Sequence, residues 1–451
     1  MLRGAAIWLA IAVTACAGSH APDAAEPNAD APRLIAEPWP EADARFASDP
    51  RWLGGDGALS IALDGERTLW LFGDSFAADG SLPRGERTDR TGRAGSVMVR
   101  NSIAIQDGSQ LATARLRFYT RSDAQGRPSA FFPDDPGKPT WLWPGHGLRT
   151  RDGVIVFMHR MAPDESPGGL GFTPAGPVVL AISNIDEPPP LWRIERVAMP
   201  ALPSAGLVGA SVLREGAHVY AFGVRDPGDR ALTLVRWSAE RFLSSDLASS
   251  EVWVSASEGF VREGSAGALL SPVSTELSVT HDPRGIGHGF VLMHSQGFGI
   301  APIEVRFAPR LTGPWSRPSV IDLAPYVAQS DGGGTMVYAA KAHPEQRGAE
   351  WVVTFAINSL EPTRIWTDLS IYFPRVLRVR RAPRRQRSNG AKRPREGVGP
   401  VGLCPTGGGT AHVPPVTSAW RERPSRAWGH RSPARARAAP ARLRTTYAAT
   451  A

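Results

Sequence analysis

The stretch GGDGALSIALDGERTLWLFGDSF, residues 54–76, decides the fold that we expect for the chain. Residues 58–63 and 66–72 are short, rich in apolar and aromatic side chains, and joined by Asp64-Gly65. An Asp-Gly pair between two such runs is a strong signal for a β-hairpin. The pattern therefore predicts two antiparallel strands that meet at a tight turn.

Two aspartates flank this hairpin at nearly equal distances from its turn. Asp56 lies eight residues before Asp64, and Asp74 lies nine residues after Gly65. Because neighbouring strands lie about 5 Å apart, the two carboxylates are expected roughly 5–10 Å from each other at the open end. This range includes the separations used in glycosidic-bond hydrolysis, about 5–5.5 Å for retention and about 6.5–9.5 Å for inversion. The alternative is that both are ordinary strand-end residues, where aspartate is common.

The same pattern of strand, turn and strand recurs at residues 145–161, 209–226, 276–296 and 336–359. Self-similar β units that start about 60–90 residues apart are typical of propeller blades. Five units predict an all-β fold, a five-bladed β-propeller over residues 39–380. The inner strands of such blades end at one face, which would gather Asp56, His146, Ala210, Glu276 and residues 335–338. An irregular β-sandwich or two β domains is the alternative.

Residues 1–16 have the pattern of a processing signal. Arg3 precedes an apolar run at residues 5–13, which is too short for an ordinary transmembrane helix. The following Val13-Thr14-Ala15-Cys16 resembles a bacterial lipobox, which implies cleavage before Cys16 and attachment of lipid to its sulfur. We therefore expect an exported protein anchored to the cell envelope, at the outer membrane in a Gram-negative organism. An ordinary secretory signal is the alternative.

Two segments flank the expected propeller. Residues 17–38 are expected to form a flexible tether because they are rich in Ala, Pro and Asp. Residues 381–451 are rich in Arg, Pro and Ala without a sustained period, which predicts disorder. From residue 380 onward the chain has 16 Lys/Arg and two Asp/Glu, a net charge of +14. The formal charge of +8 for the whole chain therefore leaves a net charge of about −6 for the residues before it. We therefore expect no nucleic-acid partner.

Several kinds of site lack support in the sequence. The chain has two cysteines, Cys16 and Cys404, one near each end, so a disulfide framework is not expected. The histidines lack the tight spacing of metal motifs, and no glycine-rich phosphate loop opens a helix. We expect no catalytic metal and no cofactor.

Four strings resemble one known family: the hairpin at residues 54–76, RNSIAIQ at 100–106, TGPW at 312–315 and YAAKAHPE at 338–345. They resemble the domain-of-unknown-function 4185 family, five-bladed propellers related to the endo-D-arabinanases of glycoside hydrolase family 183. The resemblance spans about residues 40–380. It implies a D-arabinofuranan substrate and catalysis by two aspartates, which fall on Asp56 and Asp74. By analogy we assign Asp56 as the base and Asp74 as the acid.

Other candidates for the site lie at or near the expected inner-strand ends. Glu276 is the main rival acid, and Trp141, Trp143 and Tyr338 offer aromatic faces for sugar rings. The predicted substrate-binding residues are Trp141, His146, Glu276, His294, Gln296, Tyr338, Lys341 and His343. For each of them, and for His159, a structural role is the alternative, since buried histidines often bond backbone groups. Trp70, Trp315 and Trp351 are expected in the core.

The sequence thus favours a lipid-anchored glycoside hydrolase that acts, as a monomer, on a furanosyl polysaccharide with two carboxylates. Its expected partners are that polysaccharide and the membrane reached through Cys16. Two other classes stay open: a non-catalytic carbohydrate-binding propeller, and a surface scaffold lipoprotein.

Overall fold

The computed structural model describes residues 31–80, 92–166, 171–282, 289–295, 299–327, 334–346 and 350–383. The chain divides into Met1–Arg385 and Gln386–Ala451, and all described residues belong to the first unit. The expected signal, the lipidation site Cys16 and nearly all of the expected tail lie outside the described residues. Among these residues, no helix has the length and apolar character needed to cross a membrane.

The predicted hairpin is present. Strand β3 (Leu59–Ala62) pairs with β4 (Arg67–Phe72) in antiparallel register, with Leu59 opposite Leu71. The Asp64 side chain accepts hydrogen bonds from the backbone N–H groups of Glu66 and Arg67, which fixes the turn. The hairpin continues into β7 (Ser102–Asp107) and β8 (Arg115–Tyr119), giving a first sheet of four strands.

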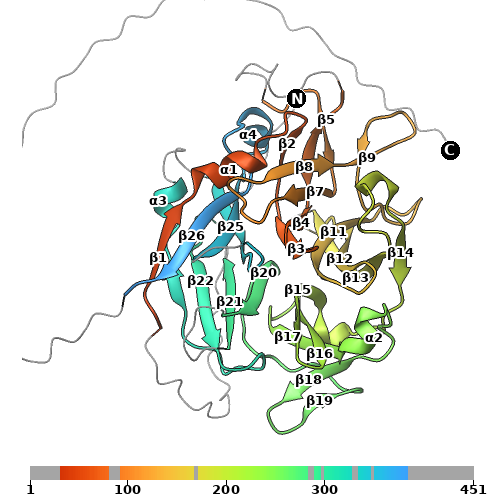
Figure 1. Cartoon of the computed structure of the whole chain (residues 1–451), viewed down its shortest axis with the longest axis vertical. Helices are drawn as coiled ribbons and strands as arrows, with labels where there is room; N and C mark the ends of the chain where they lie inside the picture. The colour runs from red at the N-terminus through yellow and green to blue at the C-terminus, as the bar shows by residue number, and fades with distance from the viewer. Residues whose placement is uncertain are drawn as a thin grey trace, which may run out of the picture. The chain divides into compact units, whose positions relative to one another are not determined.

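Four more sheets of at least four strands follow within the described residues (Figure 1). The second consists of β11 (Trp141–Arg149), β12 (Val154–Pro163), β13 (Phe172–Ile182) and β14 (Ile194–Val197). The third consists of β15 (Leu207–Glu215), β16 (His218–Val224), β17 (Leu232–Ser238), β18 (Glu251–Ser255) and β19 (Gly259–Val261). The fourth consists of β20 (Leu277–His281), β21 (Phe290–Ser295), β22 (Ile303–Ala308) and β23 (Ser319–Ile321).

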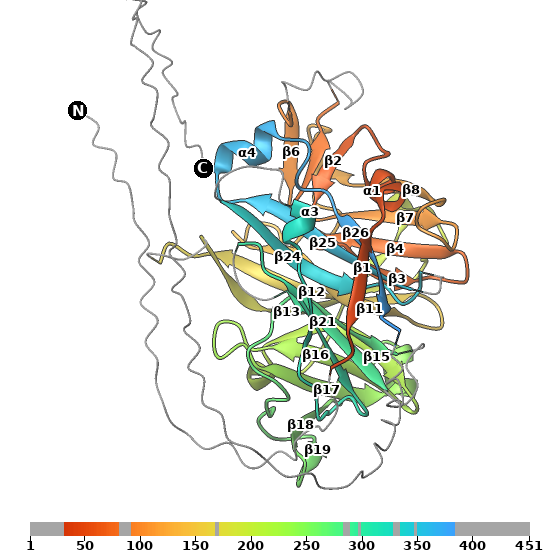
Figure 2. The ribbon, with the colours of Figure 1, turned by 90° about the vertical axis from the view of Figure 1, so that its left-hand side faces the viewer.

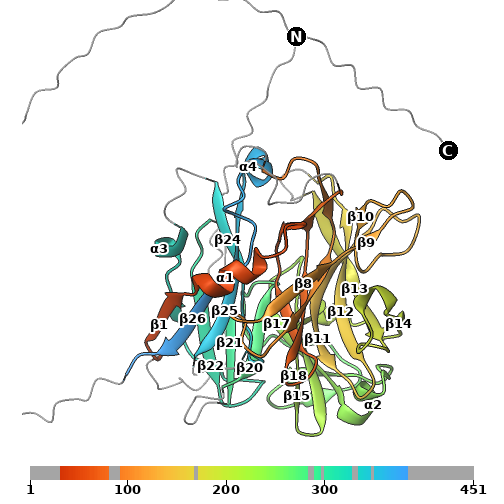
Figure 3. The ribbon, with the colours of Figure 1, turned by 45° about the horizontal axis from the view of Figure 1, so that its top comes forward.

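The fifth sheet joins the two ends of the described chain. Strands β24 (Thr335–Ala342), β25 (Trp351–Ser359) and β26 (Arg375–Arg381) are completed by β1 (Leu34–Pro38), which pairs antiparallel with β26. Figures 2 and 3 show β1 (red) beside β26 (blue). Residues 34–38, which were expected in the flexible tether, are therefore part of a sheet.

The remaining elements are short. Two small sheets are made of β2 (Trp52–Gly55), β5 (Ser75–Ala78) and β6 (Ser96–Val99), and of β9 (Arg121–Ser122) and β10 (Pro128–Ser129). The α-helices are α1 (Pro40–Phe46), α2 (Ala239–Leu243), α3 (Ala324–Val327) and α4 (Pro362–Thr367), and the 3-10 helices are η2 (Pro189–Leu191) and η3 (Pro203–Ala205).

The core lies between neighbouring sheets. Separate apolar clusters pack the first sheet on the second, the second on the third, the third on the fourth and the fourth on the fifth. A further cluster, which includes Trp70 and Val376, packs the fifth sheet on the first. Trp70, Trp315 and Trp351 are buried, as expected. Sheets that pack face to face in chain order and close on the first form a propeller-type arrangement.

Side chains join the inner strands β3, β11, β15, β20 and β24, which do not form backbone ladders with one another. His146 on β11 bonds the Ser60 carbonyl at 2.9 Å through Nε2 and accepts the Val212 N–H at 2.9 Å through Nδ1. Three more links complete the set: Val279 N–H to Ser211 Oγ, Ala342 N–H to Ser278 Oγ, and His343 Nδ1 with Ser60 Oγ. Every inner strand is thereby tied to two others.

Candidate active site

Asp56 and Asp74 lie together where the ladder of one long β-ribbon is interrupted. Gly55 of β2 pairs with Ser75 of β5, and the ladder resumes at Leu59 and Leu71. Between these pairs, Asp56 N–H donates to the Asp74 carbonyl at 3.3 Å, and Gly73 N–H donates to the Asp56 carbonyl at 3.0 Å. Residue 73 must be small here, because a Cβ on Gly73 would lie 2.5 Å from Asp56 Oδ1. The backbone itself therefore fixes the two aspartates side by side.

The Asp56 carboxyl lies in a poorly solvated, acidic environment. Its Oδ2 accepts hydrogen bonds from the hydroxyls of Tyr338, at 2.7 Å, and Tyr372, at 3.2 Å. Burial, followed by the nearby charges of Asp74 and Glu276, raises the pKa of Asp56 to about 8, although the two tyrosine bonds act in the opposite direction. Asp56 therefore holds a proton at pH 7, and Oδ1 is the oxygen left to carry it.

Asp74 has a different environment. Trp143 Nε1 donates to its Oδ1 at 2.9 Å, and Arg100 Nη1 donates to its Oδ2 at 3.1 Å. Burial raises the pKa of Asp74, and the bonds from Trp143 and Arg100 oppose that rise by stabilising the ionised form. The Arg100 guanidinium also lies 4.3 Å from the centroid of the Trp141 ring, so Trp141 supports the cation that pairs with Asp74.

Glu276 and Lys341 form an ion pair next to Asp56. Lys341 is buried, and its Nζ donates to the Gly57 carbonyl at 2.7 Å, the Ala339 carbonyl at 3.0 Å and Glu276 Oε1 at 3.2 Å. These bonds use all three ammonium protons. Lys341 therefore holds the turn that follows Asp56, and the Glu276 side chain, 33% exposed, is held beside it.

Backbone strain is concentrated around Asp56. Among the described non-glycine residues, five have positive φ, and three of these surround the carboxyl: Ala58 at 49°, Ala339 at 61° and Tyr372 at 65°. Ala339 lies in a β-bulge of β24 that directs Tyr338 to Asp56 and Lys341 to Gly57. Such conformations cost roughly 1–3 kcal/mol each and gather at functional sites. This arrangement therefore lowers the stability of the fold.

The predicted histidines lie within the fold. His146 and His343 join inner strands, and His343 Nε2 also contacts Thr354 Oγ1 at 2.7 Å, so both ring nitrogens of each have partners. His294 is buried, and burial lowers its pKa to about 4. Burial likewise lowers the pKa of His159 to about 4, and its Nε2 bonds the Val208 carbonyl. The structure therefore gives these four histidines structural environments.

A cavity of about 230 Å³ is lined by residues of all five inner strands, and His146, Lys341 and His343 contribute to its walls. Within the described ranges, no group of three or more His, Cys, Asp or Glu side chains is arranged to hold a metal ion. Gln296 lies outside the described residues.

The structure thus brings together six of the residues selected from the sequence, namely Asp56, Asp74, Trp141, Glu276, Tyr338 and Lys341. It adds Arg100 and Tyr372 as partners of the aspartates, and it gives Trp143, expected to offer an aromatic face, a bond to Asp74. Arg100 is the first residue of RNSIAIQ, one of the strings on which the family resemblance depended, so the sequence offered a signal for its place in the site. The sequence offered no signal for Tyr372, because its contact with Asp56 joins residues far apart in the sequence.

The chain aligns in three dimensions with several solved structures. A Bacteroides ovatus protein described as a presumptive hydrolase aligns with a TM-score of 0.61 at 15% identity, over 78% of this chain and 92% of its own. The α-L-arabinofuranosidase PaAbf62A of Podospora anserina aligns with a TM-score of 0.40 at 11% identity, over 74% of this chain and 98% of its own. A xylan β-1,4-xylosidase of Bacillus halodurans aligns with a TM-score of 0.41 at 10% identity, over 74% of this chain and 53% of its own.

No curated protein matches the chain by sequence. A family model described as "Domain of unknown function (DUF5005)" matches residues 42–382. This corrects the resemblance to the domain-of-unknown-function 4185 family, which depended on four short strings between residues 54 and 345. Four short strings cover a small part of the chain, whereas the family model spans all five sheets. The chain belongs to the DUF5005 family.

Proposed function

We propose that the protein is a glycoside hydrolase that cleaves a furanosyl polysaccharide, of D-arabinan type, with Asp56 and Asp74 as its catalytic pair. In this proposal the five sheets are the blades of a five-bladed propeller. The observation that carries it is the contrast between two adjoining carboxyl groups. Asp56 is surrounded by negative charge and holds a proton, whereas Asp74 is bonded by a guanidinium and an indole N–H. Opposed environments of this kind separate an acid from a base.

In the proposed reaction, Asp56 Oδ1–H donates its proton to the glycosidic oxygen as the bond from that oxygen to the anomeric carbon breaks. Asp74, whose ionised form is stabilised by the bonds from Trp143 and Arg100, accepts a proton from the water that attacks the anomeric carbon. These roles are the reverse of those assigned by analogy. The reason is that burial and the charges of Asp74 and Glu276 raise the pKa of Asp56, which suits an acid. Lys341 and Tyr338 position Asp56, and Glu276 favours its protonated form.

Aromatic side chains next to Asp74 support a sugar substrate. The ring of Phe172 packs edge-on against that of Trp143 with 4.7 Å between centroids, and Trp141 lies beside them. Such rings offer flat apolar faces to the C–H face of a sugar.

The test is the release of reducing ends from a panel of furanosyl and pyranosyl polysaccharides. Asp56→Asn and Asp74→Asn should each reduce release by at least about a thousandfold while glycan binding persists. Asp107→Asn is the matched control, since Asp107 is an exposed aspartate of β7 that pairs with Arg117. If wild type binds glycan but releases no reducing ends, the protein is a glycan-binding propeller; if it binds no glycan, the scaffold reading gains.

We also propose that the protein is exported, cleaved before Cys16 and anchored to the cell envelope as a monomer by lipid on that residue. The basis is the sequence Val13-Thr14-Ala15-Cys16 after a short apolar run. Labelling of cells with a palmitate probe should mark wild type and leave Cys16→Ala unmarked. Equal labelling of the two proteins would reject lipidation at this site.

A further inference from the structure

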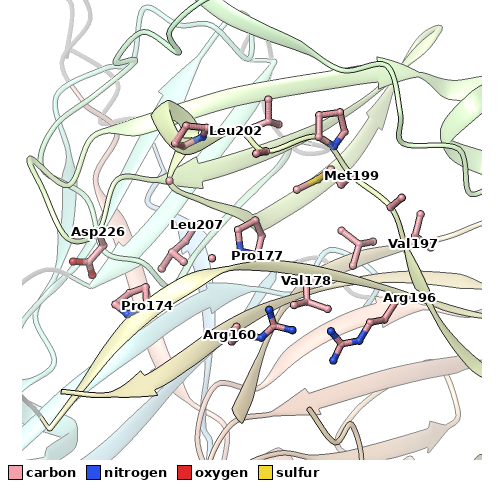
Figure 4. A pocket seen from close by; sticks show the side chains of 17 residues that line it. Arg160, Pro174, Pro177, Val178, Arg196, Val197, Met199, Leu202, Leu207 and Asp226 are labelled. Carbon is pink, nitrogen blue, oxygen red and sulfur yellow. The ribbon is translucent and has the colours of Figure 1, made fainter. Parts of the chain in front are cut away.

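A second cavity, of about 630 Å³, lies between the second and third sheets (Figure 4). Its walls are largely apolar and include Pro174, Pro177, Val178, Met199, Leu202 and Leu207. Neither catalytic aspartate lines it. Cavities of roughly 300–1,000 Å³ hold small organic ligands, so there is room for one or two sugar rings.

One end of this cavity is cationic. Figure 4 shows the guanidinium groups of Arg160 and Arg196 close together beneath the apolar wall. Both donate to the buried carboxylate of Asp134, Arg160 Nε at 2.9 Å and Arg196 Nη2 at 2.7 Å. Within the part of the chain that the structure describes, Arg160 Nη1 and the Nε and Nη1 of Arg196 have no protein acceptor. Asp134 thus fixes the two guanidinium groups and leaves several N–H groups available.

The local charges do not cancel. Arg160, Arg196 and Lys138 contribute three positive charges, and Asp134 and Asp135, to which they are paired, contribute two negative ones. Asp226 lines the other end of the cavity, where its charge is offset by Arg230 at 3.7 Å. The excess positive charge favours an anion at the arginine end. A planar carboxylate suits the geometry, because guanidinium groups bind carboxylates through parallel N–H bonds.

The strands that line the cavity also carry the aromatic residues next to Asp74. Arg160 is paired with Leu142 on β11, directly before Trp143. Strand β13 starts at Phe172, which packs on Trp143, and continues to Pro174 and Pro177 in the cavity wall. At about 3.3 Å per residue, the cavity begins roughly 7–17 Å along β13 from the aromatic group. A polysaccharide seated at the aspartates could therefore extend to it.

We propose that this cavity is an accessory subsite for a uronic acid residue of the polysaccharide. The sugar carboxylate binds Arg160 and Arg196, and the C–H face of its ring lies on the apolar wall. The inference rests on the proposed function for cleavage of a furanosyl polysaccharide, and it adds that this polysaccharide carries uronic acid residues, beyond its neutral furanosyl units, a few sugar units from the cleaved bond.

The test measures binding by calorimetry, which does not require turnover. The probes are tri-galacturonate and a neutral pyranosyl trisaccharide, titrated into the full-length protein. Arg196→Gln removes one guanidinium of the subsite, and Ala198→Trp fills the cavity while it keeps the charges. Arg214→Gln is the matched control, because Arg214 is an exposed arginine of β15 outside the cavity.

Tri-galacturonate should bind wild type and Arg214→Gln equally, and Arg196→Gln and Ala198→Trp at least about tenfold more weakly, the loss expected for one charge-assisted contact. The neutral trisaccharide should bind all four proteins equally weakly. The subsite would be overturned if wild type bound both probes with equal affinity or did not bind tri-galacturonate. It would also be overturned if Arg196→Gln and Ala198→Trp both kept the wild-type affinity for tri-galacturonate. A protein that releases no reducing ends but binds tri-galacturonate in this pattern loses the proposed catalysis and keeps the subsite.

Discussion

The Tyr372 hydroxyl lies 3.2 Å from Asp56 Oδ2, although 316 residues separate them in the sequence. Tyr338 reaches the same oxygen at 2.7 Å. Asp56 belongs to the ribbon that leads into the first sheet, whereas Tyr338 lies on β24 and Tyr372 precedes β26 in the fifth. The two hydrogen bonds that hold the Asp56 carboxyl in place are therefore made only when the fifth sheet closes against the first.

Removal of a tyrosine hydroxyl should raise the pH at which activity is lost. The Tyr338 bond stabilises the ionised form of Asp56, so Tyr338→Phe raises the pKa of Asp56 further above about 8. The acid is active while protonated, so the alkaline limb of kcat/KM should move upward by about half to one pH unit, the equivalent of one hydrogen bond.

Tyr326→Phe is the control for this shift, because the Tyr326 hydroxyl bonds the Ala36 carbonyl away from the aspartates. A downward shift in Tyr338→Phe would contradict the assignment of Asp56 as the acid. An equal shift in the two variants would show that the effect does not come from the Asp56 contact.

Asp56→Asn should stabilise the fold at alkaline pH. The folded pKa is raised to about 8 from an unfolded value near 3.9, so the folded state binds the extra proton between these limits. Wild-type stability therefore falls as pH rises through this window, by at most ~1.4 kcal/mol per unit. Asparagine does not titrate, so the variant should match wild type near pH 4 and exceed it by about 2–4 kcal/mol at pH 8, after allowance for solvent screening.

Urea denaturation at pH 4, 6 and 8 measures this difference, with Asp107→Asn as the exposed control. A gap between Asp56→Asn and wild type that is the same at all three pH values would mean that Asp56 is not protonated in the folded protein at neutral pH.

The local parts of this structure could be predicted from the sequence, and the long-range parts could not. Asp64-Gly65 and the flanking apolar runs specify the hairpin, and the hairpin alone brings Asp56 to Asp74. The repeats predicted five β units in the right order. By contrast, β1 was assigned to a tether, because its pairing with β26 joins the two ends of the described chain.

The histidines show how little of the site can be predicted from local sequence. Nothing in the residues around His146 or His343 distinguishes a ring that binds sugar from one that joins two strands. The difference lies in the partners of the ring nitrogens, Ser60 and Val212 for His146, which come from other sheets. Tyr372 was missed for the same reason.

His146→Leu should therefore lower stability and leave substrate affinity intact. The substitution leaves the Ser60 carbonyl and the Val212 N–H without their partner, at a cost of about 2–4 kcal/mol. His281→Leu is the control, because the His281 side chain is 52% exposed. Denaturation midpoints and KM for the polysaccharide substrate should be measured together. A raised KM with unchanged stability would restore His146 as a substrate-binding residue.

Arg93 should prove sensitive to substitution, although it touches neither aspartate. It is fully buried, and its guanidinium donates to the carbonyls of Leu53, Ile365, Asp368 and Ile371. Burial lowers its pKa to about 10, so it stays charged at neutral pH. Arg93→Met leaves four carbonyls unsatisfied and should cost about 3–5 kcal/mol.

Arg93→Lys separates the charge from the geometry of these bonds. The guanidinium carbon lies 5.8 Å from the centroid of the Tyr372 ring, and Tyr372 holds its strained backbone, with φ of 65°, beside it. A lysine keeps the charge but has one nitrogen to serve carbonyls on several sides, so Tyr372 should lose its fixed position and its bond to Asp56. The alkaline limb of Arg93→Lys should then move upward as in a Tyr372→Phe protein, and combining the two changes should add little. Fully additive shifts would mean that Arg93 stabilises the fold without positioning Tyr372.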